Sequence, residues 1–537
     1  MKINYISLFT LVLIALTSCF NELEQAPMSD DYITEIDVYS SPEQARHALI
    51  KIYAAYALSG QQGSEGNPDI VGGDEAKGQF FRALSALNVM TTDEAIIRSS
   101  SFGARDLTTT SWAADNLFAE ALYKRLGIII TYSNSFIDRA RDLSEDKETQ
   151  YYIAEARFLR AYAYMHLMDL FGRVPLETKV SNELPEQVSR ETLFNFVEGE
   201  LIELTTLLKD DGTNEYGRVS KAAANATLSR LYLNAEVYTG TPMYDKCIEY
   251  CEATLASGYY KLFTTDVTGN GSSFDELFMA DNNENGAQVE MMFTLNYDGQ
   301  NSQTNGGSSY WVLANTLLGM SEDSLGAVGG WQQVKICPEL VNKFTPTRMG
   351  TDAKGDVVPL EWRDSRALFA TAEESRGFII SEIAGADDGY GTYKFRNVRT
   401  DGRPTNDPGK YFADIDVPLI RMGEIYLNYA EAILRTDGDK NTTLQYINEL
   451  RKRANAELIT VADLDLDFIL DERARELYLE CFRRPDLIRF GKFTTGYNWT
   501  FKGGEKAGKD IDEKFNLFAI PTSVLMANDK LTQHKDF

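Results

Sequence analysis

The sequence predicts a mainly α-helical protein, in which helix pairs of tetratricopeptide-like length form a scaffold and one large, loop-rich insert interrupts it. Two observations predict this architecture. Apolar residues recur at helical spacing over much of the N-terminal half and again near the C-terminus. In the insert this periodicity fades, Gly, Asn, Ser and Asp become frequent, and only short β-like runs such as Val289–Leu295 remain. We therefore expect one domain at 41–537, with a helical scaffold at 41–258 and 417–537 and the insert at 259–416.

The first eighteen residues have the features of an export signal. Lys2 provides a positive start, and the apolar run Leu8–Leu16 is too short to span a bilayer. The run leads into Thr17, Ser18 and Cys19, which is typical of a bacterial lipobox, because small residues fit the signal peptidase and the thiol accepts the lipid. We expect residues 1–18 to be a lipoprotein signal peptide, Cys19 to be lipidated and 19–40 to be a tether. An ordinary signal peptide with a chance cysteine is the alternative.

The helices are predicted in order from residue 41. Ser41, Pro42 and Glu43 are typical of a helix start and predict a helix to about Leu58. The stretch 59–80 is rich in Gly, Gln and Asp and predicts a long loop. Apolar periodicity predicts the next helices at the following ranges: Trp112–Arg141, 144–172, Arg190–Leu208, Lys221–Ala235 and Met243–Ala256.

Three more amphipathic helices fill residues 418–493 almost without linkers. Asp416 and Pro418 suit the first turn of the first helix. Asp467 is expected to cap the third, and Pro485 to stop it. Each helix is short and has one apolar face, so the three must pack against one another or against the scaffold.

Charge and cysteine content narrow the classes of partner. The chain carries 53 Lys and Arg against 80 Asp and Glu, a net charge of −27, which argues against nucleic acid and against electrostatic docking on an anionic membrane. This negative charge fits a surface that meets neutral ligands.

Beyond Cys19, the spacing of the cysteines indicates neither a disulfide framework nor a zinc site, although a disulfide between two of them remains an alternative. Buried free thiols are expected at Cys247, Cys251, Cys337 and Cys481.

Catalytic and metal-binding patterns are scarce. The chain has three His residues and neither an HExxH sequence nor a GxSxG elbow. The run Asp281–Gly286 resembles the start of a calcium loop, but Met292 stands where the bidentate Glu is required. A polar turn is therefore favoured there, with calcium as the alternative. Carboxylate pairs for glycoside hydrolysis cannot be found from spacing, so that activity also stays open.

Five long segments resemble the SusD/RagB family of outer-membrane nutrient-binding lipoproteins. They are EARFLRAYAYMHLMDLFGRVPL (155–176), GRVSKAAANATLSRLYLNA (217–235), RMGEIYLNYAEA (421–432), INELRKRA (447–454) and ERARELYLECFRRPDLIRFGKF (472–493). The resemblance implies about four helix pairs and a non-catalytic protein on the outer membrane that faces the cell exterior. It also implies that the protein captures an oligosaccharide and delivers it to a SusC-like TonB-dependent transporter. The alternatives are a peptide-binding member of the family, a surface glycoside hydrolase and a purely structural lipoprotein.

The resemblance also implies where ligand binds. In relatives, the loop after a Thr-Asp-Glu element meets aromatic positions of the insert, and the element here is Thr92-Asp93-Glu94. Planar aromatic rings cover the apolar face of a sugar, while amides or charged groups satisfy its hydroxyls. For each aromatic residue, packing in the core is the competing interpretation. The predicted ligand-binding residues are Asp93, Arg98, Phe102, Tyr310, Trp311 and Trp331.

Overall fold

A computed structural model describes most of the chain. Cys19, the predicted signal peptide and nearly all of the predicted tether lie outside the described residues. The described ranges are 38–60, 70, 77–99, 102–316, 320–371 and 376–537.

Helices dominate the N-terminal half, as predicted. Polar side chains cap several of them: Ser41 accepts a hydrogen bond at the start of α3, Asn116 at α6, Asp146 at α7 and Ser189 at α8. Sequence reasoning missed α4, α5 and α10 and placed the start of α6 a few residues early. The helices are α3 (Pro42–Ala57), α4 (Phe80–Asn88), α5 (Phe102–Thr108), α6 (Leu117–Ala140), α7 (Lys147–Phe171), α8 (Arg190–Leu207), α9 (Lys221–Leu233), α10 (Ala235–Thr239) and α11 (Tyr244–Ala256).

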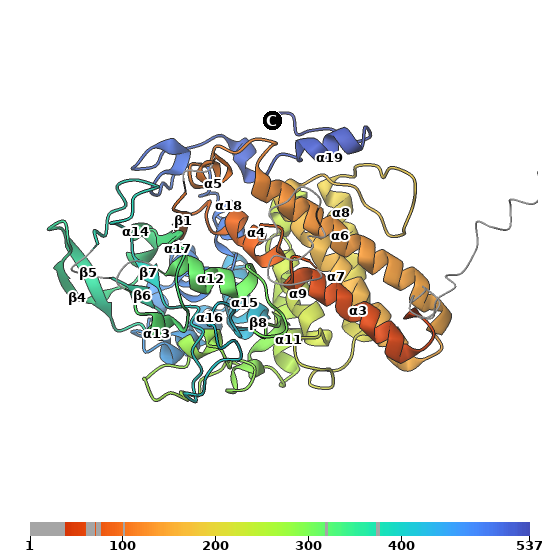
Figure 1. Cartoon of the computed structure of the whole chain (residues 1–537), viewed down its shortest axis with the longest axis horizontal. Helices are drawn as coiled ribbons and strands as arrows, with labels where there is room; N and C mark the ends of the chain where they lie inside the picture. Colours follow the sequence, from red (N-terminus) through yellow and green to blue (C-terminus); the bar gives the residue numbers. More distant parts are fainter. Residues whose placement is uncertain (1–37, 61–69, 71–76, 100–101, 317–319, 372–375) are drawn as a thin grey trace, which may run out of the picture.

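These helices pack side by side in chain order. α6 packs on α7, α7 on α8, α8 on α9 and α9 on α11, and Figure 1 shows them as a layered stack on one side of the molecule. Helix α11 also packs against α15 (Met422–Arg435), which brings the C-terminal helices onto the same stack. The scaffold predicted from apolar periodicity is therefore continuous in space although the insert divides it in sequence.

The C-terminal helices differ from the prediction at their ends. Residues expected to open the first helix form strand β8 instead, because they pair with β2 (Met291–Leu295) of the insert, with Leu295 opposite Val417. Asp465 rather than Asp467 caps α17. Helix α17 already ends at Leu477, so Pro485 does not stop it and lies inside α18 instead. The elements are β8 (Val417–Arg421), α15 (Met422–Arg435), α16 (Lys440–Arg453), α17 (Leu466–Leu477), α18 (Arg483–Arg489) and α19 (Thr522–Ala527).

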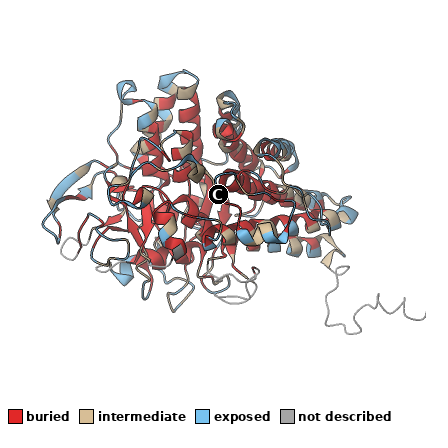
Figure 2. Ribbon diagram, turned by 90° about the horizontal axis from the view of Figure 1, so that it is seen from above, coloured by how far each residue is buried: buried red, intermediate tan, exposed pale blue. Residues whose placement is uncertain are grey.

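The insert contains short elements separated by loops, as expected from its composition. The strands form two-stranded antiparallel sheets: β4 pairs with β5 and β6 with β7 inside the insert, whereas β3 and β2 of the insert pair with β1 and β8, which lie before and after it. The β4–β5 hairpin extends from one end of the molecule, and much of it is exposed (Figure 2). Strand β1 comprises Ala95–Ile97, and the elements of the insert are β2 (Met291–Leu295), α12 (Gly307–Asn315), α13 (Glu322–Leu325), β3 (Val334–Ile336), α14 (Pro338–Val341), β4 (Pro346–Thr351), β5 (Val357–Trp362), β6 (Phe369–Ala370) and β7 (Gly391–Thr392).

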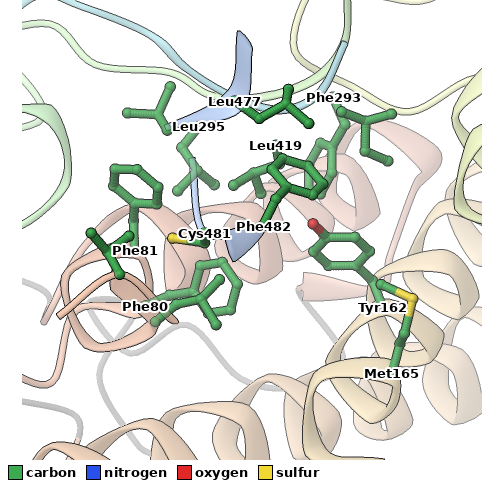
Figure 3. Close-up of a cluster of buried hydrophobic side chains, with 14 of the residues drawn as sticks. Phe80, Phe81, Tyr162, Met165, Phe293, Leu295, Leu419, Leu477, Cys481 and Phe482 are labelled. Carbon is green, nitrogen blue, oxygen red and sulfur yellow. The ribbon is translucent and has the colours of Figure 1, made fainter. Parts of the chain in front are cut away.

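The core joins scaffold and insert. Figure 3 shows Phe80 and Phe81 of α4, Tyr162 of α7, Phe293 of β2 and Phe482 beside α18 within one cluster of buried side chains. Such shared burial of apolar surface favours folding of these segments as one unit. All four cysteines in the described residues are buried free thiols. Among the helices described, none is long and apolar enough to cross a membrane.

A buried ion-pair network ties the insert to the C-terminal helices. Arg421 lies 2.9 Å from Glu290, 2.8 Å from Glu476 and 2.6 Å from Glu480. Arg453 contacts both Glu290 and Glu476. All five side chains are at most 2% exposed. Because burial of an unpaired charge is very unfavourable, each member depends on the others.

Candidate ligand-binding site

Gln79 holds together the three helices that carry the site. Its side-chain oxygen accepts hydrogen bonds from the backbone N–H groups of Arg82 at 2.8 Å, in α4, and of Gly307 at 2.9 Å, in α12. Its amide nitrogen donates to the carbonyl oxygens of Tyr56 and Ala57 at the end of α3. Gln79 is fully buried, so these bonds fix α4 against α12.

Arg82 projects from α4 over two aromatic rings of the insert. The centre of its guanidinium group lies 4.7 Å from the ring centre of Tyr310 and 5.5 Å from that of Trp331. The two rings are 6.2 Å apart and inclined by 50°. Tyr310 is almost fully buried, and burial raises the pKa of its hydroxyl, whereas Trp331 is only half-buried. Trp331 therefore carries this cation–π cluster to the surface.

The loop that bears Trp331 is fixed by its backbone. The N–H of Trp331 donates to the carbonyl oxygen of Leu313 at 2.8 Å, and the N–H of Gln333 donates to that of Ala314 at 2.9 Å. Gln332 between them has φ = +51°, a left-handed conformation that residues other than glycine rarely adopt. Strained backbone of this kind persists where the surroundings enforce it, often at binding sites. The backbone that carries the indole is thus fixed before any ligand arrives.

Gly330 gives a direct test of this positioning. A Cβ atom at residue 330 would overlap the side chain of Thr316, whereas a Cβ at Gly329 would meet open space. We expect Gly330→Ala to displace Trp331 and to destabilise the fold by about 1–3 kcal/mol, as overpacking does. Trp331 fluorescence and chemical denaturation measure the two effects.

Gly329→Ala is the matched control. It introduces left-handed strain at φ = +66°, which costs about 1 kcal/mol, but it creates no clash with Thr316. If both variants left the environment of the indole equally unchanged, close packing on Thr316 would not be what positions it.

Arg98 lies beside the same loop. It follows β1, which pairs with β3, and its backbone N–H donates to the carbonyl oxygen of Gln333. Its guanidinium group donates to the carbonyl and side-chain oxygens of Gln332 at 3.4 and 3.3 Å, and to the carbonyl oxygen of Ala384 at 3.2 Å. The structure therefore places Arg98, Tyr310 and Trp331 around this loop together with Arg82, and that they bind ligand stays a prediction.

Asp93 and Trp311 do not belong to this surface. Asp93 is fully buried, where Arg483 donates to its oxygens at 2.6 and 2.8 Å and Tyr497 donates at 2.6 Å. Burial opposes ionisation of Asp93, but the Arg483 charge prevails and holds its pKa well below the usual range. Trp311 is also fully buried and stacks on Phe395 at 6.1 Å. The prediction that these two residues contact ligand is corrected, because both side chains are enclosed by interior partners.

Comparison with known proteins decides the family. Residues 380–536 match the SusD family, and residues 70–233 match the family described as "Starch-binding associating with outer membrane". The chain is 35% identical over 577 aligned positions to the starch-binding protein SusD of Bacteroides thetaiotaomicron, and the alignment covers the whole of both proteins. This chain belongs to the SusD family. The resemblance inferred from the five sequence segments is thus confirmed.

More distant SusD-family proteins share the fold. A SusD-like protein of Bacteroides ovatus is 24% identical over 68% of this chain and 64% of its own length. The crystal structure of a SusD homologue from Bacteroides thetaiotaomicron has a TM-score of 0.70 at 19% identity and covers 95% of this chain and 100% of its own. A SusD-like carbohydrate-binding protein from Bacteroides fragilis has a TM-score of 0.69 at 19% identity, with 92% and 99% covered. These matches confirm the mainly helical fold class.

Three sequence predictions remain for this SusD-family chain: Phe102 as a ligand contact, Cys19 as the lipidated residue and the candidate calcium loop at Asp281–Gly286. Phe102 is the first residue of α5, but its side chain lies outside the described part, as does Cys19. The candidate calcium ligand Asp281 is buried and accepts hydrogen bonds from the backbone N–H and the hydroxyl of Thr400. Among the described residues, no group of three or more His, Cys, Asp or Glu side chains is arranged to hold a metal ion.

Arg82 and Gln79 are the site residues that sequence reasoning missed. Both flank the start of α4, within or just after a stretch expected to be a loop. A single arginine on a short apolar helix carries no pattern that separates a ligand contact from ordinary solvation. Its role becomes visible only when the fold places it over Tyr310 and Trp331.

Proposed function

We propose that this chain is a cell-surface lipoprotein that binds oligosaccharides without cleaving them and delivers them to a SusC-like TonB-dependent transporter. One observation carries the proposal. A protein whose full-length relative is named for starch binding presents a half-buried indole, Trp331, on a fixed loop between two arginines, Arg82 and Arg98.

The chemistry of this cluster suits capture. The indole offers a flat apolar surface to the C–H face of a sugar ring, and guanidinium N–H groups donate to its hydroxyls. Glycoside hydrolysis requires a pair of carboxyl groups on either side of the scissile bond. The four side chains gathered here, Arg82, Arg98, Tyr310 and Trp331, include none. Sustained product formation from glycans by the purified protein would favour a hydrolase instead.

The proposed location rests on three observations. The family matched by residues 70–233 is described as associating with the outer membrane. The N-terminus carries a lipobox-like sequence that ends in Cys19. The net charge of −27 disfavours electrostatic adsorption, so acylation is the stronger means of attachment. Co-purification with a barrel transporter from detergent-solubilised membranes tests the partnership, and Cys19→Ala should release the protein from the membrane.

Trp331→Ala is the variant that tests glycan binding. We expect it to weaken binding of a malto-oligosaccharide by about 10–100-fold, which corresponds to the loss of one stacked aromatic anchor. Isothermal titration calorimetry measures the affinity, and circular dichroism should show unchanged helix content. Tyr259→Ala is the matched control, because Tyr259 is an exposed aromatic residue outside the cluster.

Two outcomes would contradict this proposal. Equal affinity of Trp331→Ala and the unchanged protein would remove Trp331 from the site. Failure of the unchanged protein to bind any glycan, combined with binding of peptides, would favour the peptide-binding alternative. Trp311→Ala is a poor probe here, since loss of a fully buried indole destabilises a fold by about 3–5 kcal/mol.

A further inference from the structure

A pocket of about 400 Å³ lies where α16 ends and α17 passes the base of the β4–β5 hairpin. It shares no lining residue with the Trp331 cluster. Four basic side chains line it, in a chain whose net charge is −27. These side chains are Lys343, Arg363, Arg451 and Arg475.

Glu472 holds two of these arginines side by side. Its Oε2 atom accepts a hydrogen bond from Nη1 of Arg451 at 2.8 Å and from Nε of Arg475 at 2.7 Å. Both guanidinium groups also lie over the ring of Phe468, at 5.6 and 5.3 Å from its centre. The two planar cations are therefore fixed by a common carboxylate and a common ring before any ligand binds.

Each of these arginines keeps one nitrogen for the pocket. Besides Glu472, Arg475 donates through Nη1 to the carbonyl oxygen of Lys343 at 2.8 Å, and Arg451 donates through Nε to that of Glu457 at 2.6 Å. No hydrogen bond from the Nη2 atom of either arginine is present within the described part of the chain, and neither atom is sealed from solvent. Arg475 itself is nine-tenths buried and lines the pocket, which is consistent with its Nη2 atom facing the pocket.

Four basic side chains and three acidic ones, Asp364, Glu457 and Asp471, line the pocket. The other oxygen of Glu472 is bound by Arg366 at 2.8 Å, so one carboxylate faces three guanidinium groups. Asp364 is committed to Arg366 at 2.7 and 2.9 Å, and Asp471 to Lys343 at 2.8 Å. Arg363 is exposed and makes no side-chain hydrogen bond or ion pair with any of the residues described. Two of the three lining acids are thus engaged by cations, whereas Arg363 has no such partner among the residues described.

We infer that this pocket binds a ligand that carries a carboxylate or sulfate group, as an acidic saccharide does. Guanidinium groups recognise such oxyanions through paired N–H donors. Here Arg363 can move onto the anion while Arg451 and Arg475 are already in place. The threonine hydroxyls of Thr345 and Thr347 also line the pocket and supply further donors. This second site is independent of the glycan surface at Trp331.

Three hexoses that differ in one substituent test the ligand class. The full chain is titrated with glucuronate, glucose 6-sulfate and glucose at fixed ionic strength, and with inorganic sulfate. We expect at least one charged hexose to bind about tenfold more tightly than glucose. Preference for glucuronate indicates a carboxylate ligand, and preference for glucose 6-sulfate indicates a sulfate ester. Equal binding by inorganic sulfate would identify the oxyanion alone as the ligand. If neither charged hexose bound more tightly than glucose, the inference would be overturned.

Two substitutions test the residues. Arg363→Gln should weaken binding of the charged hexose about tenfold, with an unchanged melting temperature because Arg363 is exposed. Arg475→Lys keeps a positive charge beside Glu472 but loses the guanidinium group and with it the Nη2 atom that would contact the anion. We expect it to weaken binding of the charged hexose to a similar extent. Arg105→Gln, an exposed arginine on α5, and Trp331→Ala should both retain binding of the charged hexose. Unaltered affinity in both Arg363→Gln and Arg475→Lys would exclude this pocket, whatever the result at Trp331.

Discussion

Replacement of Arg421 by leucine is expected to lower the free energy of unfolding by about 3–5 kcal/mol, the usual cost of breaking a buried ion pair from one side. Arg421 is 1% exposed and donates to the carboxylates of Glu290, Glu476 and Glu480, as well as to the carbonyl oxygen of Glu476. Leucine fills part of the space, but the buried carboxylate oxygens lose the cation that neutralises part of their negative charge. Urea denaturation followed by circular dichroism measures the difference.

Arg403→Leu is the matched control for this prediction. Arg403 also forms ion pairs, with Asp401 at 2.6 Å and Glu284 at 3.4 Å, but its side chain is 66% exposed. Solvent-exposed pairs contribute about 0–1 kcal/mol, so this variant should remain close to the unchanged protein. Similar small losses in both variants would show that the buried network contributes little to stability.

The position of Arg421 gives this network a consequence for the binding surface. Glu290 directly precedes β2 of the insert, Arg421 ends β8, and Glu476 and Glu480 lie in and after α17. β2 leads into the segment that reaches Tyr297, whose hydroxyl hydrogen-bonds to Ala57 and Gln79. Gln79 in turn fixes α4 and α12. Weakening the network should therefore make the positions of α4 and α12, which carry Arg82 and Tyr310, less fixed, although no residue of the network belongs to the Trp331 cluster.

Much of the fold could be predicted because helical periodicity is a local property. The apolar stripes of α3, α7, α8, α9 and α11 lie within single helices, so the sequence displays them directly. Pairing between distant segments has no such signal. The segment Val417–Arg421 looks like a helix start, and only its partner β2, more than a hundred residues earlier, makes it a strand. The end of α17 before Pro485 was missed for the same reason. It depends on the positive φ angles that Leu479 and Cys481 adopt in the packed structure.

The site was predictable in part for a related reason. Trp331 follows two glycines in a loop, and Arg98 follows a buried strand, so their exposure was a fair expectation. Burial of the neighbouring candidates depends on partners far away in sequence. Asp93 meets Arg483, and Trp311 meets Phe395. Residue type alone cannot separate an aromatic residue that packs in the core from one that stacks on a sugar.

Stability is expected to fall steeply as the pH drops from 4.5 toward 2. Burial would by itself raise the pKa of Glu431 and Glu472, but neighbouring arginines prevail and lower both values to about 2, from 4.5 in an unfolded chain. In this range the unfolded chain binds protons that the folded protein does not, so acid favours unfolding. The two groups together account for roughly 7 kcal/mol at the full shift. Urea denaturation at a series of pH values measures the loss.

Two other buried carboxyl groups give the opposite trend at higher pH. Burial raises the pKa of Glu94 and of Asp416 to about 8. Between pH 8 and 4.5 the folded protein binds protons at these groups that the unfolded chain does not, so their contribution rises as the pH falls. Combined with the loss below pH 4.5, this predicts maximum stability near pH 4–5. Asp416→Asn, which cannot ionise, should flatten the slope above that maximum, and Glu431→Gln should flatten the slope below it. Stability that stayed constant from pH 4.5 to 3 would show that the arginine-paired carboxylates do not control acid unfolding.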